Sequence, residues 1–150
     1  MKNKLKIVLI LLLVVIIFMS CLFYIEHTQV KIGNSYFNLP IGCSENKIDE
    51  NHINITNGNI SLILSEYSSN NTDVKKTVKY YMDSKKNESL DCELDEKIIN
   101  NNPTYKTTIL NNTNIVHYWF IKNDKIYEIA THDGNSKTDS IVTEIITSMK

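Results

Sequence analysis

Four histidines are the side chains best suited to acid–base or metal chemistry in this 150-residue chain, and they lie far apart in the sequence. They are His27, His52, His117 and His132. None forms an H-E-x-x-H or H-x-H pattern, the spacings that place two imidazoles on one metal ion. His117 and His132 could approach each other across a C-terminal hairpin beside Asp133, but polar side chains scattered over a sheet are the more ordinary case. We therefore expect no metal site.

An acidic segment is the second place where an ion could bind. Asp91, Glu93, Asp95 and Glu96 fall within six residues of each other. Alternate acids on a strand could hold Ca²⁺ weakly, but the segment lacks the glycine and the loop of a calcium motif. A solvated strand face is the simpler interpretation.

Motifs of catalysis and cofactor binding are missing from the sequence. There is no G-x-S-x-G, no glycine-rich phosphate loop and no recognisable Cys/His spacing. Only four glycines are present, so close backbone approach to a cofactor is hard to build. All basic residues are lysine, so bidentate guanidinium recognition of carboxylates or phosphates is excluded. We expect a non-catalytic protein without a bound cofactor, although a triad assembled from distant residues would leave no motif.

The cysteines predict one disulfide bond. Cys43 and Cys92 are the two cysteines outside the apolar N-terminal segment, and an isolated pair in an oxidising compartment favours a disulfide over a metal site. The bond would close a loop of 92 − 43 = 49 residues and stabilise the fold by about 4 kcal/mol. In a strictly anaerobic setting the same pair could remain as two buried thiols.

Asparagine-linked glycosylation is a further expectation. Five asparagines begin an N-x-[ST] sequon, namely Asn54, Asn59, Asn70, Asn87 and Asn111. Such triplets arise often by chance in an asparagine-rich chain. Asn70, Asn87 and Asn111 fall in predicted loops and are the candidates.

The N-terminal segment is typical of a membrane anchor. Lys2, Lys4 and Lys6 precede an apolar run from Ile7 to Ile25 whose one polar member is Ser20. Nineteen helical residues span about 28 Å, close to the thickness of the hydrocarbon core. The lysines favour an N-terminus in the cytoplasm. We expect a single-pass protein of the cell membrane with its C-terminal domain outside the cytoplasm.

The same segment is compatible with two kinds of processed signal. A cleaved secretory signal would have a shorter apolar core and a small-residue cleavage site. A lipoprotein signal is suggested by Met19-Ser20-Cys21, which makes Cys21 a lipidation candidate, although Phe18 fits a lipobox poorly. Each alternative still leaves the residues from about 27 onward outside the cytoplasm.

The rest of the chain is expected to form one external domain. The predicted boundaries are a basic N-terminus at 1–6, the anchor at 7–25, a short stalk at 26–29 and the domain at 30–150. Beyond the anchor the chain carries 13 basic and 17 acidic residues, a balance of 13 − 17 = −4. An acidic domain is a poor partner for nucleic acid, because that affinity comes from neutralising phosphates.

Alternating and helical patterns predict the order of elements in this domain. Hairpins are expected around Gly33-Asn34 and Asn57-Gly58. A helix is expected within 70–88, capped by Asn71 or Thr72, followed by strands near 91–99 and 104–110. The chain ends in a helix for which Ser136 and Asp139 are spaced as a capping box.

The last hairpin constrains the architecture. If Lys122 and Lys125 flank its turn, Phe120 pairs with Tyr127, and both faces of the two strands are substantially apolar. Such strands are covered on both sides, and two amphipathic helices are available as covers. The predicted fold class is therefore α+β: an N-terminal transmembrane helix, then an antiparallel sheet packed between two helices.

The order of elements and a few short motifs resemble the PsbP-like fold. These motifs are Phe37-x-Leu39-Pro40-x-Gly42, the Trp119-Phe120…Tyr127-x-Ile129 hairpin and a terminal helix ending in Ser148-Met149. PsbP-like proteins include extrinsic photosystem II subunits. The resemblance implies a PsbP-like sandwich over about residues 30–150, and this chain has Cys43 where relatives often have an aromatic residue. None of the family's metal-binding or partner-binding residues can be matched.

Three functions are compatible with these observations. The preferred expectation is a non-catalytic binding module at the cell surface, with another envelope protein, a glycan or a small ligand as its target. An accessory subunit docked on an integral-membrane protein is the first alternative, and an envelope hydrolase with unrecognised acids or histidines is the second.

Overall fold

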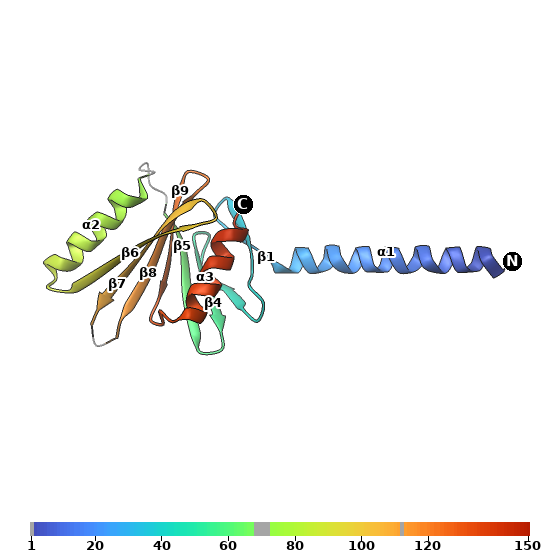
Figure 1. The fold of residues 1–150 in the computed structure, drawn as a ribbon, viewed down its shortest axis with the longest axis horizontal. Coiled ribbons are helices and arrows are strands. Elements are labelled where there is room, and N and C mark those ends of the chain that lie inside the picture. Colours follow the sequence, from blue (N-terminus) through green and yellow to red (C-terminus); the bar gives the residue numbers. More distant parts are fainter. Residues whose placement is uncertain (1, 68–72, 112) are drawn as a thin grey trace.

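The computed structural model describes the backbone of residues 2–67, 73–111 and 113–150. Within the first helix it describes side chains for residue 6 and residues 8–20. That helix, α1 (Lys2–Thr28), projects away from the rest of the chain (Figure 1). The strand β1 begins at Gln29, so the predicted stalk at 26–29 is replaced by the end of a helix and the start of a strand. Among the described residues, no helix combines the length and the apolarity needed to cross a membrane.

Two antiparallel sheets and two further helices make up the domain. The strands are β1 (Gln29–Ile32), β2 (Ser35–Asn38), β3 (Ser44–Lys47), β4 (His52–Asn57), β5 (Ile60–Tyr67), β6 (Asp91–Ile99), β7 (Asn102–Leu110), β8 (Ile115–Lys122) and β9 (Lys125–Thr131). The helices are α2 (Val74–Asn87) and α3 (Ser136–Ser148). The strands β1 and β2 pair with each other, and the other seven form one sheet in the order β3-β4-β5-β9-β8-β7-β6. The predicted α+β class is confirmed.

The last hairpin holds the centre of the large sheet, as its apolar faces predict. Phe120 pairs with Tyr127, and β9 is the middle strand of the seven. The turn residues Asn123 and Asp124 both have positive φ, which short polar side chains tolerate better than others. The register expected from the sequence is confirmed.

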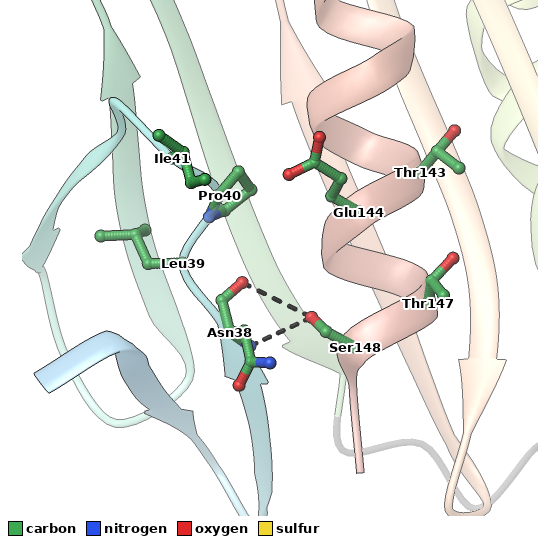
Figure 2. A pocket seen from close by; sticks show the side chains of 8 residues that line it. All are labelled: Asn38, Leu39, Pro40, Ile41, Thr143, Glu144, Thr147 and Ser148. Carbon is green, nitrogen blue, oxygen red and sulfur yellow. Dashed lines mark hydrogen bonds between the residues drawn. The ribbon is translucent and has the colours of Figure 1, made fainter. Parts of the chain in front are cut away.

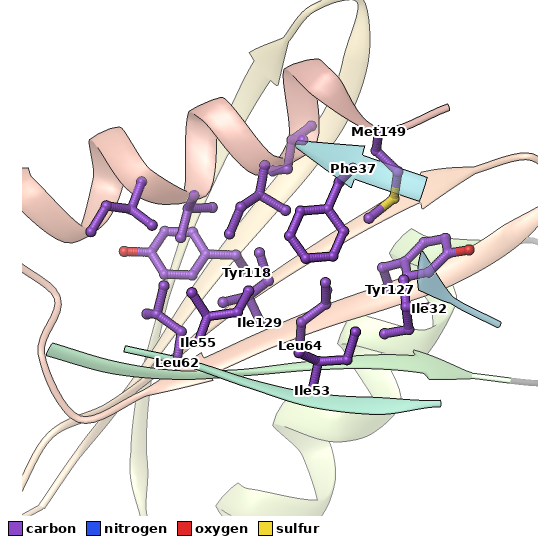
Figure 3. Close-up of a cluster of buried hydrophobic side chains, with 14 of the residues drawn as sticks. Ile32, Phe37, Ile53, Ile55, Leu62, Leu64, Tyr118, Tyr127, Ile129 and Met149 are labelled. Atoms are coloured by element: carbon purple, nitrogen blue, oxygen red, sulfur yellow. The ribbon is translucent and has the colours of Figure 1, made fainter. Parts of the chain in front are cut away.

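One side of the large sheet, called the α3 face, carries the main core. Alternate residues of β4, β5, β8 and β9 point toward α3 and the β1–β2 hairpin, and Figure 3 shows them in contact. The apolar stripe of α3 and its C-terminal end is buried here and consists of Ile141, Val142, Ile145, Ile146 and Met149. Ile145 and Phe37 are 0% and 1% exposed. Burying such aliphatic and aromatic surface is the main free energy that holds the domain together.

The opposite side, called the α2 face, has a smaller cluster. Its buried apolar members are Val74, Val78, Tyr105, Trp119 and Ile126, with Tyr81 and Met82 packed at the border. The helix expected within 70–88 therefore packs on the sheet through Val74 and Val78. Since α3 contributes to the cluster on one face and α2 to the cluster on the other, the two helices cover opposite sides of the sheet, which is the expected sandwich.

Local details differ from the sequence-based expectations at turns and caps. The β4–β5 hairpin turns at Gly58-Asn59, one residue later than predicted, because Asn57 pairs with Ile60 and Gly58 supplies positive φ at the first loop position. Asp73, and not Asn71 or Thr72, caps α2 by accepting the Lys76 N–H.

Two further boundaries are corrected in the second half of the chain. Asn135, one residue before the predicted capping box, caps α3 by accepting the N–H groups of Lys137 and Thr138. The strand β7 begins at Asn102 and includes Pro103, because Asn100 and Asn101 alone make the turn with positive φ. Proline is tolerated here because β8 pairs with β7 only from Thr104 onward.

Candidate functional site: a groove beside the first helix

A groove of about 380 Å³ separates the loop after β2 from the outer surface of α3. Figure 2 shows its two walls. The groove is lined by Asn38, Leu39, Pro40, Ile41, Thr143, Glu144, Thr147 and Ser148.

The sequence around Pro40 shows why the chain leaves the sheet here. Proline has no N–H to give to a neighbouring strand, so β2 ends at Asn38. The chain then turns back, with the Cys43 N–H donating to the Pro40 carbonyl at 3.0 Å and Gly42 at a φ of +78°. This tight turn projects Ile41 into solvent.

A hydrogen bond fixes the floor of the groove. Ser148 Oγ accepts the backbone N–H of Asn38 at 3.0 Å and lies 3.4 Å from the carbonyl oxygen of the same residue. These contacts, drawn in Figure 2, join β2 to the last turn of α3. Backbone hydrogen bonds between Tyr36 and Lys150, 2.8 and 3.1 Å long, continue the junction. The two walls therefore keep a fixed spacing at this end.

The walls of the groove differ in chemistry. On the loop side they are apolar, and Ile41 is 87% exposed, an unusual position for so large an aliphatic side chain. On the helix side they carry hydroxyl groups and one carboxylate, that of Glu144. Such a groove can bind an apolar side chain together with a cationic or hydrogen-bond-donating group, and its lining contains no pair of acids suited to acid–base catalysis.

The groove lies next to the end of α1. Gln29, the residue that follows this helix, pairs directly with Asn38 at the rim of the groove. Cross-strand partners are about 5 Å apart, so this end of the groove lies one strand spacing from the residue that follows α1.

A partly buried polar network lies elsewhere, between α2 and the sheet, with Glu128 7% exposed and Tyr67 41% exposed. Glu128 accepts hydrogen bonds from Tyr67 Oη and from His117 Nδ1, each 2.5 Å long. The other imidazole nitrogen, Nε2, lies 2.6 Å from Tyr81 Oη. We call these four residues the Tyr–His–Glu network. The ring of Trp119 packs against both tyrosines, with centroid distances of 5.9 Å to Tyr67 and 5.2 Å to Tyr81.

The phenols of this network are poor nucleophiles. Burial, together with the hydrogen bond to Glu128, raises the pKa of Tyr67 well above its ordinary value. Burial and the nearby Glu128 carboxylate raise the pKa of Tyr81 in the same way. Both hydroxyls therefore stay protonated near neutral pH and act as donors. Through the contact between Tyr81 and His117, the network connects α2 to the sheet.

The histidines singled out in the sequence have separate surroundings. His117 belongs to the network, whereas His132 is exposed just beyond β9. His52 lies 2.8 Å from Asp49, and this hydrogen bond lowers the Asp49 pKa. Among the described residues no group of three histidine, cysteine or acidic side chains could hold a metal ion. His27 lies in a part of α1 whose side chains are outside the described residues.

The predicted Cys43–Cys92 disulfide is wrong. Both cysteines are free thiols. Cys43 precedes β3 and Cys92 lies in β6, the strands at the two ends of the large sheet. Six strand spacings of about 4.8 Å separate those edges by roughly 29 Å, whereas a disulfide needs Cα atoms within about 7 Å. Cys43 packs on the α3-face core, and burial raises the pKa of the Cys92 thiol.

The candidate sites of glycosylation and lipidation differ in their structural positions. Asn111 is exposed in the β7–β8 loop, as predicted, whereas Asn87 is the last residue of α2 and not a loop residue. Asn70 and the side chain of Cys21 lie outside the described residues. Glycosylation and lipidation stay predictions.

Neither the groove nor the network was found from the sequence. The Phe37-x-Leu39-Pro40-x-Gly42 motif and the Ser148-Met149 ending do border the groove, but they served only to indicate the fold. The network escaped because Tyr67, Tyr81, His117 and Glu128 come from four different elements. The pairing of Trp119 with Glu128 across the predicted hairpin was the one signal that placed an acid beside this aromatic cluster.

Comparisons with other proteins yield only a likeness of fold. The sequence matches no protein-family profile and no curated protein. The structure is similar to the crystal structure of a protein from Bacteroides thetaiotaomicron, with 15% identity and a TM-score of 0.49 over 77% of this chain and 44% of that one. This chain thus spans less than half of that protein.

The structure is also similar to the solution structure of cyanobacterial PsbP (CyanoP) from Synechocystis. Identity is 12% and the TM-score 0.48, over 81% of this chain and 90% of that one. The expected structural similarity to PsbP is confirmed, and it concerns the α+β arrangement alone.

Proposed function

We propose that this protein is a membrane-anchored, non-catalytic binding module whose groove beside α1 takes a segment of a partner protein at the cell surface. The observation that carries the proposal is the groove itself, which has a volume of about 380 Å³. Ile41, 87% exposed, lines one wall, and the hydroxyl-bearing surface of α3 forms the other. An exposed aliphatic anchor beside a few polar groups is the usual composition of a peptide-binding surface.

The role proposed for α1 is that of an anchor with its N-terminus in the cytoplasm. Every large apolar side chain from Val8 to Met19 is between 55% and 63% exposed, so this part of α1 packs against no described element of the domain. A continuous apolar surface of this kind needs another apolar medium, and a bilayer provides one. The lysines at positions 2, 4 and 6 support this orientation.

The position of the groove favours one class of partner. Because Gln29 pairs with Asn38, a ligand in the groove would lie at the membrane surface if α1 is the anchor. The juxtamembrane segment of an integral-membrane protein is available at that level. This favours, as the second candidate function, an accessory subunit of a membrane complex over a receptor for soluble ligands.

Site-specific photocross-linking in intact membranes tests the proposal. A benzoylphenylalanine at position 41 should give a discrete cross-linked product with a protein of the same membrane. The matched control places the same group at Tyr80, which is 64% exposed on α2, away from the groove. Identical products from both positions, or none from position 41, would contradict binding through the groove.

The anchor is tested separately by adding protease to intact cells. The domain should be digested while a small fragment containing α1 stays in the membrane. Protection of the whole chain would refute the proposed topology. Release of the domain by a lipoprotein-specific peptidase would mean that a lipid on Cys21, and not α1, is the anchor.

A further inference from the structure

The strand β6 leaves one edge of the large sheet open. It is the last strand in the order β3-β4-β5-β9-β8-β7-β6 and is nine residues long, paired along its full length with β7. The strand at the other end, β3, has only four residues. A long edge strand presents a row of backbone N–H and C=O groups that another strand can use. Among the described residues no further strand pairs with this edge of β6.

Side chains on the two faces of β6 differ. On the α2 face, Leu94 and Ile98 are 43% and 78% exposed, and Glu96 between them forms an ion pair with Lys75 of α2 at 3.4 Å. On the α3 face lie Glu93, Asp95 and Lys97, with Asp95 and Lys97 3.2 Å apart in an exposed ion pair. The open edge therefore offers two exposed apolar side chains on one face and two carboxylates, Glu93 and Asp95, on the other, a pattern that an incoming strand can match.

A surface hollow of about 530 Å³ adjoins the acidic face. It is lined by Glu93, Leu94, Asp95, Lys106 and Thr108. Lys106 forms an ion pair with Asp139, whose carboxylate lies 2.8 Å from the lysine nitrogen, so its positive charge is already neutralised. The carboxylate of Glu93 makes no ion pair within the described part of the chain, so the hollow has an excess of negative charge.

The charge of β6 favours a basic strand of another protein over a second copy of this chain as the strand that pairs with its edge. Four acids and one lysine give the strand a formal charge of 1 − 4 = −3. Two copies paired through this strand would bring two such charges together, and like charges across an interface cost free energy. A basic strand would instead place positive charges opposite the carboxylates of β6, which lowers the free energy of the complex.

We infer that the open edge of β6 binds, by strand addition, an extended segment of a partner protein in which basic and apolar residues alternate. Backbone hydrogen bonds to the edge would fix the register. Basic side chains on one face would meet Glu93 and Asp95, and apolar side chains on the other would cover Leu94 and Ile98. This site is independent of the groove beside α1.

The test uses a fluorescent eight-residue peptide of alternating lysine and valine, added to the full chain in detergent micelles. Fluorescence anisotropy measures binding, and amide NMR shifts locate it. Two control peptides keep the composition and charge: one gathers the lysines into a block, and the other carries N-methyl groups on alternate backbone nitrogens. Binding should be at least about tenfold weaker for both controls, because both lose the strand pattern.

The matched protein variants are Glu93→Lys with Asp95→Lys on β6, and Glu45→Lys on β3. The β6 variant should lose the alternating peptide, and the β3 variant should retain it. Equal binding of all three peptides would reduce the effect to charge alone and overturn the inference. Shifts confined to other elements, or a β6-dependent dimer of the chain in sedimentation, would overturn it as well. The N-methylated peptide keeps the test valid on the unaltered chain if the β6 variant fails to fold.

Discussion

The two faces of the large sheet are built in different ways. Toward α3, eighteen buried apolar residues form one continuous core. Toward α2, the buried apolar cluster has only five residues, and four polar side chains of the Tyr–His–Glu network fill the space beside it. Each face is covered by its own amphipathic helix, yet only the α3 face has an extensive apolar core like the interior of a larger protein.

This difference indicates a division of labour. Non-directional apolar burial on the α3 face supplies most of the folding free energy. On the α2 face, the hydrogen bond between Tyr81 and His117 joins α2 to the sheet, and displacing the helix would leave these partly buried groups without their partners. We therefore expect substitutions on the α3 face to unfold the domain and those on the α2 face to loosen one helix.

The largest difference is expected from two isoleucines of the same strand, β9. Ile129 is 0% exposed on the α3 face and Ile126 is 1% exposed on the α2 face. Ile129→Ala should cost about 4 kcal/mol and Ile126→Ala about 2 kcal/mol, because the larger core cannot collapse around the cavity. Urea unfolding of the full chain in micelles, followed by Trp119 fluorescence and circular dichroism, measures both. Equal costs would remove the proposed asymmetry.

Two buried glutamates sharpen the comparison at the level of hydrogen bonds. Glu128, on the α2 face, accepts from His117 and Tyr67, whereas Glu66, on the α3 face, accepts from Tyr127 at 2.8 Å. Glu128→Gln should cost about 2–3 kcal/mol, because an amide NH2 donor would replace one of two acceptor oxygens and face the donor of either Tyr67 or His117. Glu66→Gln should cost about 1 kcal/mol, because the remaining amide oxygen can still accept from Tyr127.

Hydrogen exchange distinguishes a local effect from a global one. For Glu128→Gln, the amides of α2 should exchange faster than those of α3. Uniform acceleration across both helices would mean that the network supports the whole domain and not α2 alone.

Alkaline pH should destabilise both faces. Burial raises the pKa of Tyr67 and Tyr81 on one face and of Tyr118 and Tyr127 on the other above their ordinary value. The folded state keeps these protons while the unfolded chain releases them, so stability is full below about pH 10 and falls as the pH rises above it.

The contribution of each face follows from paired substitutions. Tyr67→Phe with Tyr81→Phe, and separately Tyr118→Phe with Tyr127→Phe, should each flatten the decline in the unfolding free energy between about pH 10 and 12. Urea midpoints at stepped pH values provide the measurement. If only one pair of substitutions changes the slope of the unfolding free energy against pH, the alkaline sensitivity belongs to the face that carries that pair.

The smallest effect concerns the two helix caps. Asn135→Ala and Asp73→Ala each remove a side chain that accepts backbone N–H groups at the start of a helix, at a cost of about 1 kcal/mol. Loss of the α3 cap should lower the global stability, because α3 closes the main core. Loss of the α2 cap should be seen mainly as faster amide exchange in its first turn, and an equal global loss would contradict the comparison.

The sequence predicted what depends on periodicity. The register of the last hairpin, the strand Asp91–Ile99 and the buried stripes of both helices follow from alternating or helical spacing of apolar residues. The short strand β3 has no such signal, because all four of its residues are exposed and polar. Caps differed by one or two residues because several asparagines and threonines compete at each helix start.

The sites were beyond the reach of the same patterns. The groove depends on how far Ile41 projects from a turn, and the network depends on side chains brought together by the pairing of distant strands. The error at Cys43 and Cys92 has the same origin, since only the strand order reveals that they lie at opposite edges.

The junction between α1 and β1 has a mechanical consequence. No residue intervenes between Thr28 and Gln29, so tilting or rotating α1 would turn the β1–β2 hairpin with it. The paired backbone hydrogen bonds between Tyr36 and Lys150 would pass that torque to the end of α3. Because these bonds hold β2 and the end of α3 together, both walls of the groove would move with α1, and its inclination would set the direction in which the groove opens relative to the membrane, not the width of the groove.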